Sequence, residues 1–312
     1  MTLVTFGETM LRLSVPAGER LETATSFDCR VGGAESNAAV AAARLGTDAA
    51  WLSKLPDSPL GRRVAGELRR YGVDPRVVYA EEGRQGTYYL EQSSTPRGTD
   101  VVYDRASSAV TTATTDELGT DATRSAEVFF TTGITPALSE TLRETTTELV
   151  DIAETTAFDL NYRGKLWSRA EARETYETLL PSVDLLFAPA RDVREVLEIE
   201  GDPAELLAAL QDAFDIETVV LTRGDAGALA RRGGETVEQP AYDAATVDPI
   251  GSGDAFAGGF LSRYIQDEPL ARALEYGAAT AALKRTIRGD LAVVSEAAVE
   301  QVIEEEAAAI NR

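Results

Sequence analysis

The chain has 312 residues, of which 44% are hydrophobic, so it is long enough to bury the core of one large α/β domain. It contains no histidine and a single cysteine, Cys29, which excludes histidine-dependent hydrolysis, histidine zinc sites and intrachain disulfides. Its formal net charge of −22 makes nucleic acid and anionic membranes poor partners, because like charges repel. No apolar run approaches the roughly 20 residues of a membrane helix, so we expect a cytoplasmic protein.

The acidic surplus is combined with a scarcity of lysine. There are 52 acidic and 30 basic residues, and only three of the basic residues are lysines: Lys54, Lys165 and Lys284. An ordinary acidic enzyme would explain the surplus alone. The two features together favour adaptation to molar intracellular salt, where self-repulsion between carboxylates is screened.

The first part of the chain predicts alternating strands and helices. We expect a strand at 3–6, a helix at 36–45 closed by Gly46, a strand at 49–53, and a helix from Pro59 to Tyr71 capped by Ser58. Further along, the pattern predicts strands at 128–131, 157–160, 185–187 and 219–222, and helices at 139–154, 168–180, 254–264, 270–285 and 295–309. This alternation is typical of an α/β fold with a central, mainly parallel sheet flanked by helices.

Two stretches, at about 11–31 and 84–109, interrupt the alternation. They contain strand-like pieces at 87–91 and 101–105, separated by turn residues and without helical periodicity. We therefore expect a small β-sheet lid, inserted into a single domain that spans residues 1–312. Such a lid would cover the carboxyl edge of the main sheet, where α/β enzymes bind their ligands.

The strongest chemical signal is the segment Asp248-Pro-Ile-Gly-Ser-Gly-Asp254, which precedes a predicted helix. The backbone N–H groups of Gly251, Ser252 and Gly253 can form a nest, and the helix N-terminus adds partial positive charge, which suits a phosphoryl group in transfer. Asp254 is placed to accept a hydroxyl proton, and the same field is expected to keep its carboxylate ionised. Taken alone, such a motif is more often a glycine loop capped by an ordinary aspartate at the start of a helix.

Two other segments remove much of that ambiguity. Gly32-Gly33-Ala-Glu-Ser-Asn37 leads into an alanine-rich helix, and the predicted strand at 219–222 continues into Arg-Gly224-Asp-Ala-Gly227. With the segment at 248–254, these resemble, in the same order, the signatures of the pfkB family of ribokinase-like carbohydrate kinases. The resemblance extends over essentially the whole chain. It implies a ribokinase-like fold and a kinase that uses ATP and Mg²⁺.

The resemblance also implies roles for individual residues. Asp254 matches the catalytic base, and Gly251, Ser252 and Gly253 match the anion hole. The sugar-hydroxyl positions match Gly32, Gly33 and Asn37, and the nucleotide positions match Thr222, Gly224 and Gly227. As isolated features, the paired glycines could form a simple turn, and the strand with its turn could be scaffold.

Within the family the chain is most similar to the 2-keto-3-deoxygluconate kinases, in segments that begin at Phe6, Gly86, Tyr103 and Asp159. The resemblance implies that Tyr89, Tyr103, Arg105 and Arg163 contact the substrate. Arginine forks and phenolic donors suit the carboxylate of a sugar acid. The alternatives are surface ion pairs for the arginines and packing within the lid for the tyrosines.

The chain departs from the family pattern at two places. The expected Asn-x-x-Glu motif, which helps to organise magnesium, is replaced by Ala190-Arg-Asp-Val193, so the metal ligands are unknown and Asp192 is a weak candidate. Arg288-Gly-Asp290 resembles a late segment whose aspartate reaches the substrate, although Leu291 replaces the usual glycine. We keep Asp290 as a substrate-binding candidate.

The hypothesis from the sequence is an ATP-dependent kinase that converts 2-keto-3-deoxygluconate, or its epimer, to the 6-phosphate by in-line transfer to an oxygen deprotonated by Asp254. The alternatives are another pfkB kinase (fructokinase, ribokinase or 1-phosphofructokinase) and a nucleotide- or sugar-binding protein without turnover. The open edges of a lid sheet favour a homodimer.

Overall fold

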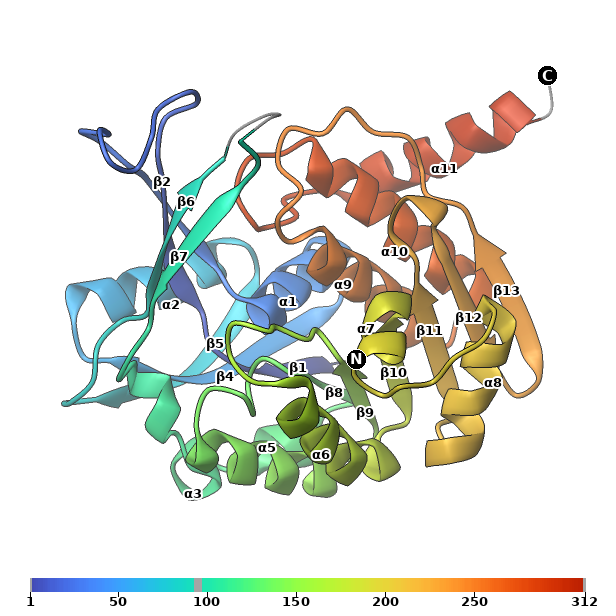
Figure 1. Cartoon of the computed structure of the whole chain (residues 1–312), viewed down its shortest axis with the longest axis horizontal. Coiled ribbons are helices and arrows are strands. Elements are labelled where there is room, and N and C mark those ends of the chain that lie inside the picture. The colour runs from blue at the N-terminus through green and yellow to red at the C-terminus, as the bar shows by residue number, and fades with distance from the viewer. Residues whose placement is uncertain (1, 93–96, 311–312) are drawn as a thin grey trace.

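The computed structural model describes residues 2–92 and 97–310, with side chains described up to residue 306. The main sheet contains β1 (Thr2–Phe6), β4 (Asp48–Pro56), β5 (Val73–Ala80), β8 (Val128–Thr132), β9 (Thr156–Asp159), β10 (Leu185–Pro189), β11 (Thr218–Thr222), β12 (Ala228–Arg232) and β13 (Glu235–Gln239). Its nine strands lie in the order β13-β12-β11-β10-β9-β8-β1-β4-β5 (Figure 1). Pairing is parallel from β11 to β5 and antiparallel at β12 and β13, which confirms the mainly parallel sheet.

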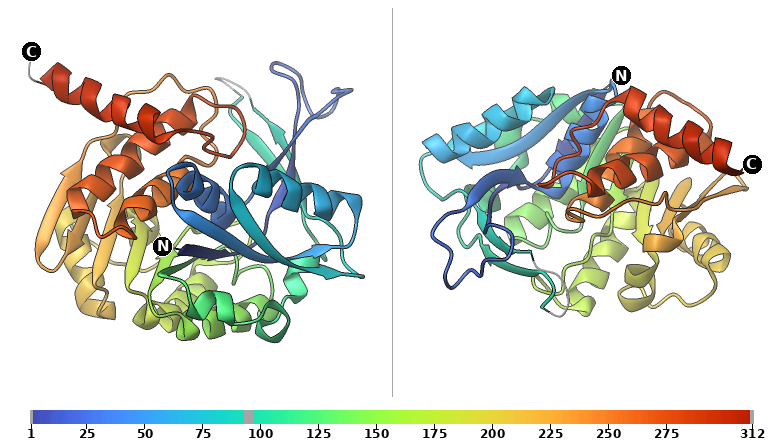
Figure 2. Two further views of the ribbon diagram at one scale, coloured as in Figure 1. Left: turned by 180° about the vertical axis from the view of Figure 1, so that it is seen from behind. Right: turned by 90° about the horizontal axis from the view of Figure 1, so that it is seen from above.

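Helices cover both faces of this sheet and bury an apolar core against each (Figures 1 and 2). One face carries α1 (Ala34–Arg44), α2 (Pro59–Arg70), α9 (Ser252–Tyr264), α10 (Leu270–Arg285) and α11 (Glu296–Ile310). The other carries α3 (Thr115–Leu118), α4 (Asp121–Arg124), α5 (Glu140–Ile152), α6 (Arg169–Leu179), α7 (Ala190–Glu195) and α8 (Pro203–Phe214). Successive strand residues alternate between the two cores: Leu3 packs into the first and Val4 into the second.

A second sheet stands beside the main one, at the upper left of Figure 1. Its strands are β2 (Met10–Ser14), β3 (Asp28–Gly32), β6 (Thr87–Glu91) and β7 (Asp100–Asp104), in the order β3-β2-β6-β7. They come from the two stretches that interrupt the alternating pattern, so the predicted small sheet is confirmed. We refer to these four strands as the lid sheet.

The predicted strands and helices are all present, with ends shifted by a few residues, and the sequence analysis missed several further elements. Strand β5 was not predicted, because it contains Pro75 and charged residues alternate with its apolar ones. Both features are tolerated because β5 lies at the edge of the sheet. The β12–β13 hairpin turns at Gly233 and Gly234, whose φ angles are +54° and +87°. Helices α7 and α8 were also missed. Within residues 2–92 and 97–310, we find no helix with both the length and the apolar character needed to cross a lipid bilayer.

Candidate active site

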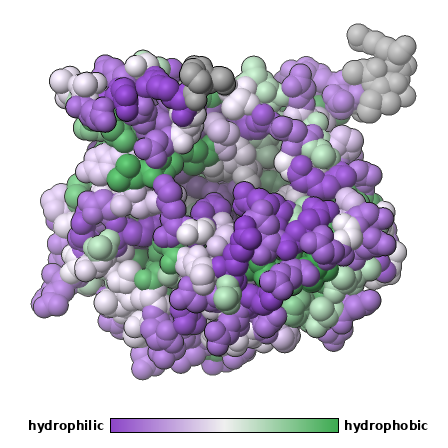
Figure 3. Space-filling model, in the orientation of Figure 1, coloured by the Kyte–Doolittle hydropathy of each residue, from purple (hydrophilic) through white to green (hydrophobic). Residues whose placement is uncertain are grey.

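A cavity of about 440 Å³ lies between the carboxyl edge of the main sheet and the lid sheet. Figure 3 shows a hollow on this face of the molecule, with a strip of hydrophobic surface beside it. The residues predicted for the site that line this cavity are Gly32, Gly33, Asn37, Tyr103, Arg105, Arg163, Asp192, Thr222, Gly251, Ser252, Gly253, Asp254 and Asp290. Folding therefore brings together segments that are more than two hundred residues apart in the chain.

The loop from Asp248 to Gly253 leads directly into α9, as the sequence predicts. Gly251 has a φ of +84°, and a Cβ at this position would lie only 2.3 Å from the backbone oxygen of Asp290, so both conformation and space require glycine here. A Cβ at Gly253 would meet no heavy atom within 4 Å. Gly251, Ser252 and Gly253 all line the cavity, so an anion can approach the start of this 13-residue helix, although the Ser252 N–H also donates to the Pro249 carbonyl at 3.3 Å.

Asp254 is half-buried in the first turn of α9 and lines the cavity. Its Oδ2 accepts a hydrogen bond from Nδ2 of Asn37 at 2.7 Å. Burial raises the pKa of Asp254 above its ordinary value, while the hydrogen bond from Asn37 and the charge of Arg163 oppose the rise. Desolvation of the carboxylate therefore opposes the expected stabilisation of its charge by the helix terminus.

The paired glycines allow the chain between β3 and α1 to pass close to Glu8 and Asp290. A Cβ at Gly33 would lie 2.0 Å from the backbone oxygen of Glu8, and one at Gly32 would lie 2.3 Å from Oδ2 of Asp290. Asn37, one turn into α1, accepts a hydrogen bond from the Gly33 N–H through Oδ1. The amide of Asn37 therefore links the two glycine-containing motifs.

Arg105 is one of the arginines that line the cavity. Its Nη1 is 3.3 Å from Oε2 of Glu8, and its guanidinium lies 4.6 Å from the ring centre of Tyr103. Within the described part of the chain, neither oxygen of Glu8 and neither Nε nor Nη1 of Arg105 has a hydrogen-bond partner, although all four atoms are buried. Arg163 is exposed at the rim, where Nη1 donates to the Tyr162 carbonyl. Arg105 thus lines the cavity as the ion-pair partner of Glu8.

One residue predicted to contact the substrate, Tyr89, does not line this cavity. Successive residues of β6 point to opposite faces of the lid sheet, so Tyr88 lines the cavity whereas Tyr89 packs edge-to-face against Phe27, with ring centres 5.9 Å apart. Tyr103 lies opposite Tyr88 in the register of β6 and β7 and shares its face. The structure therefore corrects the placement of Tyr89 and adds Tyr88.

Three buried carboxylates of the cavity were missed as candidates: Glu8, which pairs with Arg105, and also Glu35 and Asp159. Asp159 ends β9, and burial together with the neighbouring charges of Asp254 and Asp192 raises its pKa to about 8. Burial likewise raises the pKa of Glu35 to about 7, although Thr132 and Thr135 donate hydrogen bonds to it. The position of Asp159 at the carboxyl end of a parallel strand was the available signal.

Asp192, the weak metal candidate, is buried and already paired. Its Oδ1 accepts two hydrogen bonds from the Arg191 guanidinium, and its Oδ2 accepts one from the Tyr162 N–H. In residues 2–92 and 97–310, no group of three or more His, Cys, Asp or Glu side chains is arranged to hold a metal ion. A site made of protein ligands alone is therefore not present in that part of the chain.

The nucleotide candidates divide between two cavities. Thr222 lines both the central cavity and a neighbouring one of about 690 Å³, and Gly224 lines the neighbouring one. Gly227 lines neither cavity. Its φ is +82°, and a Cβ there would lie 2.1 Å from the backbone oxygen of Gln239, which gives this glycine a structural role beside β13.

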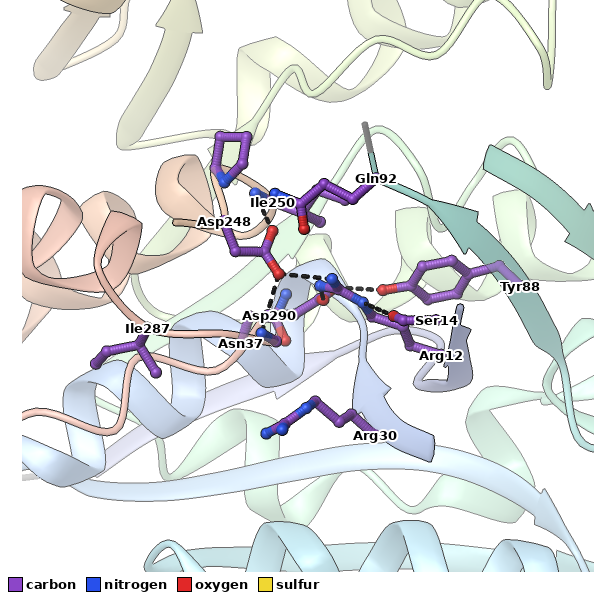
Figure 4. Close-up of polar contacts among 12 residues, drawn as sticks. Arg12, Ser14, Arg30, Asn37, Tyr88, Gln92, Asp248, Ile250, Ile287 and Asp290 are labelled. Atoms are coloured by element: carbon purple, nitrogen blue, oxygen red, sulfur yellow. Dashed lines mark hydrogen bonds and ion pairs between the residues drawn. The ribbon is translucent and has the colours of Figure 1, made fainter. Parts of the chain in front are cut away.

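Asp290 lines the cavity but is held by two partners from the lid sheet (Figure 4). Arg12 donates to its Oδ1 at 2.6 Å, and the Tyr88 hydroxyl donates to its Oδ2 at 2.6 Å. Arg12 also donates to Oδ2 of Asp248 at 2.5 Å. Sequence reasoning missed Arg12, because nothing near it in the chain indicates partners more than two hundred residues away.

A family model for the pfkB family carbohydrate kinases matches residues 2–297. The chain belongs to this family. It is 61% identical to the 2-dehydro-3-deoxygalactonokinase of Haloferax volcanii over 314 residues, covering 99% of each chain. The acid-rich, lysine-poor composition of the kinase fits this relationship to a Haloferax protein.

Solved structures support the same assignment. The crystal structure of a 2-dehydro-3-deoxygluconokinase from Thermotoga maritima has a TM-score of 0.93 and is 33% identical, covering 97% of the kinase and 98% of that chain. An Escherichia coli protein described as a possible ribokinase II has a TM-score of 0.89 at 20% identity, covering 98% and 100%, and shows the fold alone. The predictions of a ribokinase-like fold and of a carbohydrate kinase are confirmed, which removes the alternative of a binding protein without turnover.

Proposed function

We propose that the kinase transfers the γ-phosphoryl group of ATP to the 6-hydroxyl of 2-keto-3-deoxygluconate or of its C4 epimer, 2-keto-3-deoxygalactonate. The observation that carries this proposal is the presence of two unlike groups in one cavity: the guanidinium of Arg105, which lies beside Glu8, and the carboxylate of Asp254 at the start of α9. A substrate with an anionic end and a terminal hydroxyl matches both groups. The names of the Haloferax and Thermotoga relatives support this class of substrate.

The lid side of the cavity would bind the acid end. Arg105 forms charge-assisted hydrogen bonds to the carboxylate, and its stacking on Tyr103 restricts the plane of the guanidinium. Arg163 adds positive charge at the rim. The N–H groups of Gly32 and Gly33 remain the candidates for the sugar hydroxyls. A substrate held in this way has its other end directed toward α9.

Asp254 then accepts the proton of the terminal hydroxyl as that oxygen forms its bond to the γ-phosphorus. The bond between the γ-phosphorus and the β–γ bridging oxygen breaks, and ADP leaves with the electron pair. The hydrogen bond from Asn37 favours the ionised form of Asp254, which is the form that can act as a base. The backbone at Gly251, Ser252 and Gly253 lines the cavity at the start of α9, where its N–H groups would stabilise the charge on the transferring group once the Ser252 N–H exchanges its contact with the Pro249 carbonyl.

The nucleotide would occupy the neighbouring cavity, with Thr222 at the junction with the central one and Gly224 beyond it. Magnesium fits the donor set in kind, because Asp159 is buried beside Asp254 and Asp192, whose charges raise its pKa, while Arg163 opposes the rise. Asp159 and Asp192 would hold the ion through its water shell, as magnesium usually keeps several waters and binds substrate phosphates. The bound ion would neutralise charge on the phosphate oxygens.

The runner-up is a kinase for a phosphorylated sugar such as fructose 1-phosphate, because Arg105 and Arg163 could equally bind a phosphate. A coupled assay of ADP release separates the candidates, using both keto-deoxy acids, fructose, ribose and fructose 1-phosphate. We expect turnover with at least one keto-deoxy acid to exceed that with every other sugar. Faster turnover with a neutral or phosphorylated sugar would refute the proposal.

We also expect the kinase to act as a homodimer formed through the outer face of the lid sheet. Leu13, Tyr89 and Val102 lie opposite one another in the register of β2, β6 and β7, and Phe27 packs on Tyr89. Val102 and Phe27 are exposed, so this row offers an apolar surface for a second copy. Light scattering after size exclusion should give twice the 33.4 kDa chain mass, and a monomer at all concentrations would contradict the expectation.

A further inference from the structure

A cluster of buried charged and polar side chains connects the lid sheet to the loop that precedes α9 (Figure 4). It consists of Arg12, Tyr88, Asp248, Lys284 and Asp290, which we call the lid–loop cluster, and all five side chains are buried. Arg12 uses one nitrogen for each carboxylate, with N···O distances of 2.5 Å to Asp248 and 2.6 Å to Asp290. Because buried ions are costly unless paired, this arrangement strongly favours one geometry.

Arg12 reaches the backbone of the loop through its two carboxylate partners. Oδ1 of Asp248 accepts the N–H of Ile250, and its Oδ2 accepts the N–H of Gly289. The backbone oxygen of Asp290 is packed so tightly against Gly251 that a Cβ there would lie 2.3 Å from it. The side chain of Arg12 is therefore two contacts away from the N–H groups that face the phosphoryl group.

The loop is also held from the core side. Lys284, near the end of α10, is completely buried, and its Nζ donates to the carbonyl oxygen of Asp248 at 2.9 Å and to that of Ile287 at 3.4 Å. The loop residue Asp248 is thus held by a cation on each side, Arg12 from the lid sheet and Lys284 from the helical layer. Its side chain binds the first, and its main chain binds the second.

The residues of the lid sheet that hold Asp290 belong to strands that also line the sugar end of the cavity. Arg12 and Tyr88 are register partners on β2 and β6, so their positions relative to each other are set by the sheet. Tyr103, on the adjacent β7, lies opposite Tyr88 and stacks on Arg105. A change in the position of the lid sheet is therefore transmitted to Asp290, and through Asp290 to Gly251.

We propose that Arg12 is a positioning residue for phosphoryl transfer, which fixes the loop from Asp248 to Gly253 relative to the lid sheet. The guanidinium fork suits this role because it bridges two carboxylates at once, which an ammonium group cannot do with the same geometry. Removing it leaves Lys284 as the one cation of the cluster beside the two buried carboxylates of Asp248 and Asp290. Their repulsion would displace the glycine backbone that faces the transferring group. The kinetic part of this proposal rests on the proposed function.

Kinetics of Arg12→Ala and Arg12→Lys test the role, with Arg30→Gln as the matched control. Arg30, labelled in Figure 4, is the register partner of Arg12 on β3, but it is exposed and pairs with Asp28 instead of with the carboxylates of the cluster. With the sugar that the assay panel identifies, we expect kcat of both Arg12 variants to fall about tenfold to a hundredfold, the effect of a misplacement of about 1 Å. The sugar KM should change less than about threefold, since Arg12 makes no predicted contact with the sugar.

Methylguanidinium provides a readout that a merely structural defect would not give. Added at tens of millimolar, it should restore part of the lost kcat of Arg12→Ala and have no effect on Arg30→Gln. A folded Arg12→Ala variant with the kcat of the unmodified kinase would overturn the proposal. An effect on sugar KM alone, or an absence of rescue, would equally overturn it.

Hydrogen exchange tests the positioning role without any sugar, so its result is independent of the proposed function. In Arg12→Lys, peptides covering 248–254 and 286–292 should exchange faster than in the unmodified kinase, whereas peptides from β8 and β9 should not change. If neither Arg12 variant folds, Tyr88→Phe, which removes only the hydroxyl that donates to Asp290, is measured in the same way. Unchanged exchange in both loop peptides of the folded variant would refute the role of the cluster.

Discussion

Asn37 donates a hydrogen bond from Nδ2 to Oδ2 of Asp254 across 2.7 Å, although 217 residues separate them in the chain. The contact joins the first turns of α1 and α9, the two helices that follow the glycine-containing motifs. It also places a donor on a half-buried carboxyl group whose pKa is raised by desolvation. Asn37 therefore has a second role beside the one expected from sequence, since it favours the basic form of Asp254.

Replacement of Asp254 by Asn should remove the proton acceptor while keeping the shape of the side chain. We expect kcat to fall by about 10²–10⁴ and the sugar KM to change little, because a general base contributes in the transition state. Steady-state kinetics measure both. Asp267→Asn, an exposed position in the turn that follows α9, is the control for loss of one charge. Near-normal turnover of the Asp254 variant would exclude it as the base.

The Asn37→Ala variant should show its main effect in the pH dependence of kcat/KM. Activity requires ionised Asp254, so kcat/KM should rise with pH through the pKa of that group. Loss of the donor destabilises the ionised form by about 1.5–3 kcal/mol, which corresponds to about one to two pH units. The acidic limb of the profile should therefore move to higher pH. Arg44→Gln, at the other end of α1, should leave the profile in place. An unshifted limb in Asn37→Ala would show that the hydrogen bond does not tune the base.

Arg105→Met should weaken binding of the sugar acid far more than it slows turnover. Loss of a charge-assisted hydrogen bond of about 1.5–3 kcal/mol predicts a rise in KM of about tenfold to a hundredfold. The matched control is Arg84→Met, another lid arginine, which pairs on the surface with Asp104. Rates with neutral sugars such as fructose should be the same in both variants. An equal rise in KM for acid and neutral sugars would show that Arg105 does not recognise the carboxylate.

Glu35 should make the stability of the kinase depend on pH. Its pKa is about 7 in the folded state against 4.5 ordinarily, so between these values the folded state keeps a proton that the unfolded chain releases. The stabilisation is complete at low pH and is lost as pH rises through about 7, with a slope of at most about 1.4 kcal/mol per pH unit. Thermal melts at about pH 5 and about pH 8 should show Glu35→Gln gaining stability relative to the unmodified kinase at the higher pH. The exposed Glu19→Gln is the control, and a difference from the unmodified kinase that is independent of pH would contradict the prediction.

The unfolding temperature should rise with salt, from tens of millimolar to molar KCl. The net charge of −22 is carried by a chain with only three lysines, so screening removes more repulsion than attraction. Melts in KCl, with activity followed in parallel, measure the effect. Full stability and activity in dilute buffer would show that the composition is not an adaptation to salt.

The sequence by itself determined those features that depend on local backbone chemistry. The glycines before α9, the cap and proline at the start of α2, and the alternation of apolar runs depend on conformations that neighbouring residues set among themselves. For this reason the strands, the helices, the lid sheet and the loop at 251–253 could be predicted, and the three motifs in order indicated the family. Even the ends of most elements agree within a few residues.

Only the tertiary structure decided which side chains meet and what environment they share. Tyr88 rather than Tyr89 faces the cavity because the pleat of β6 has one register against its neighbours. Arg12 meets Asp248 and Asp290, and burial raises the pKa of Asp254, because segments distant in the chain pack together and exclude water. The physical reason is that desolvation and charge pairing depend on three-dimensional neighbours, which the local order of residues does not specify.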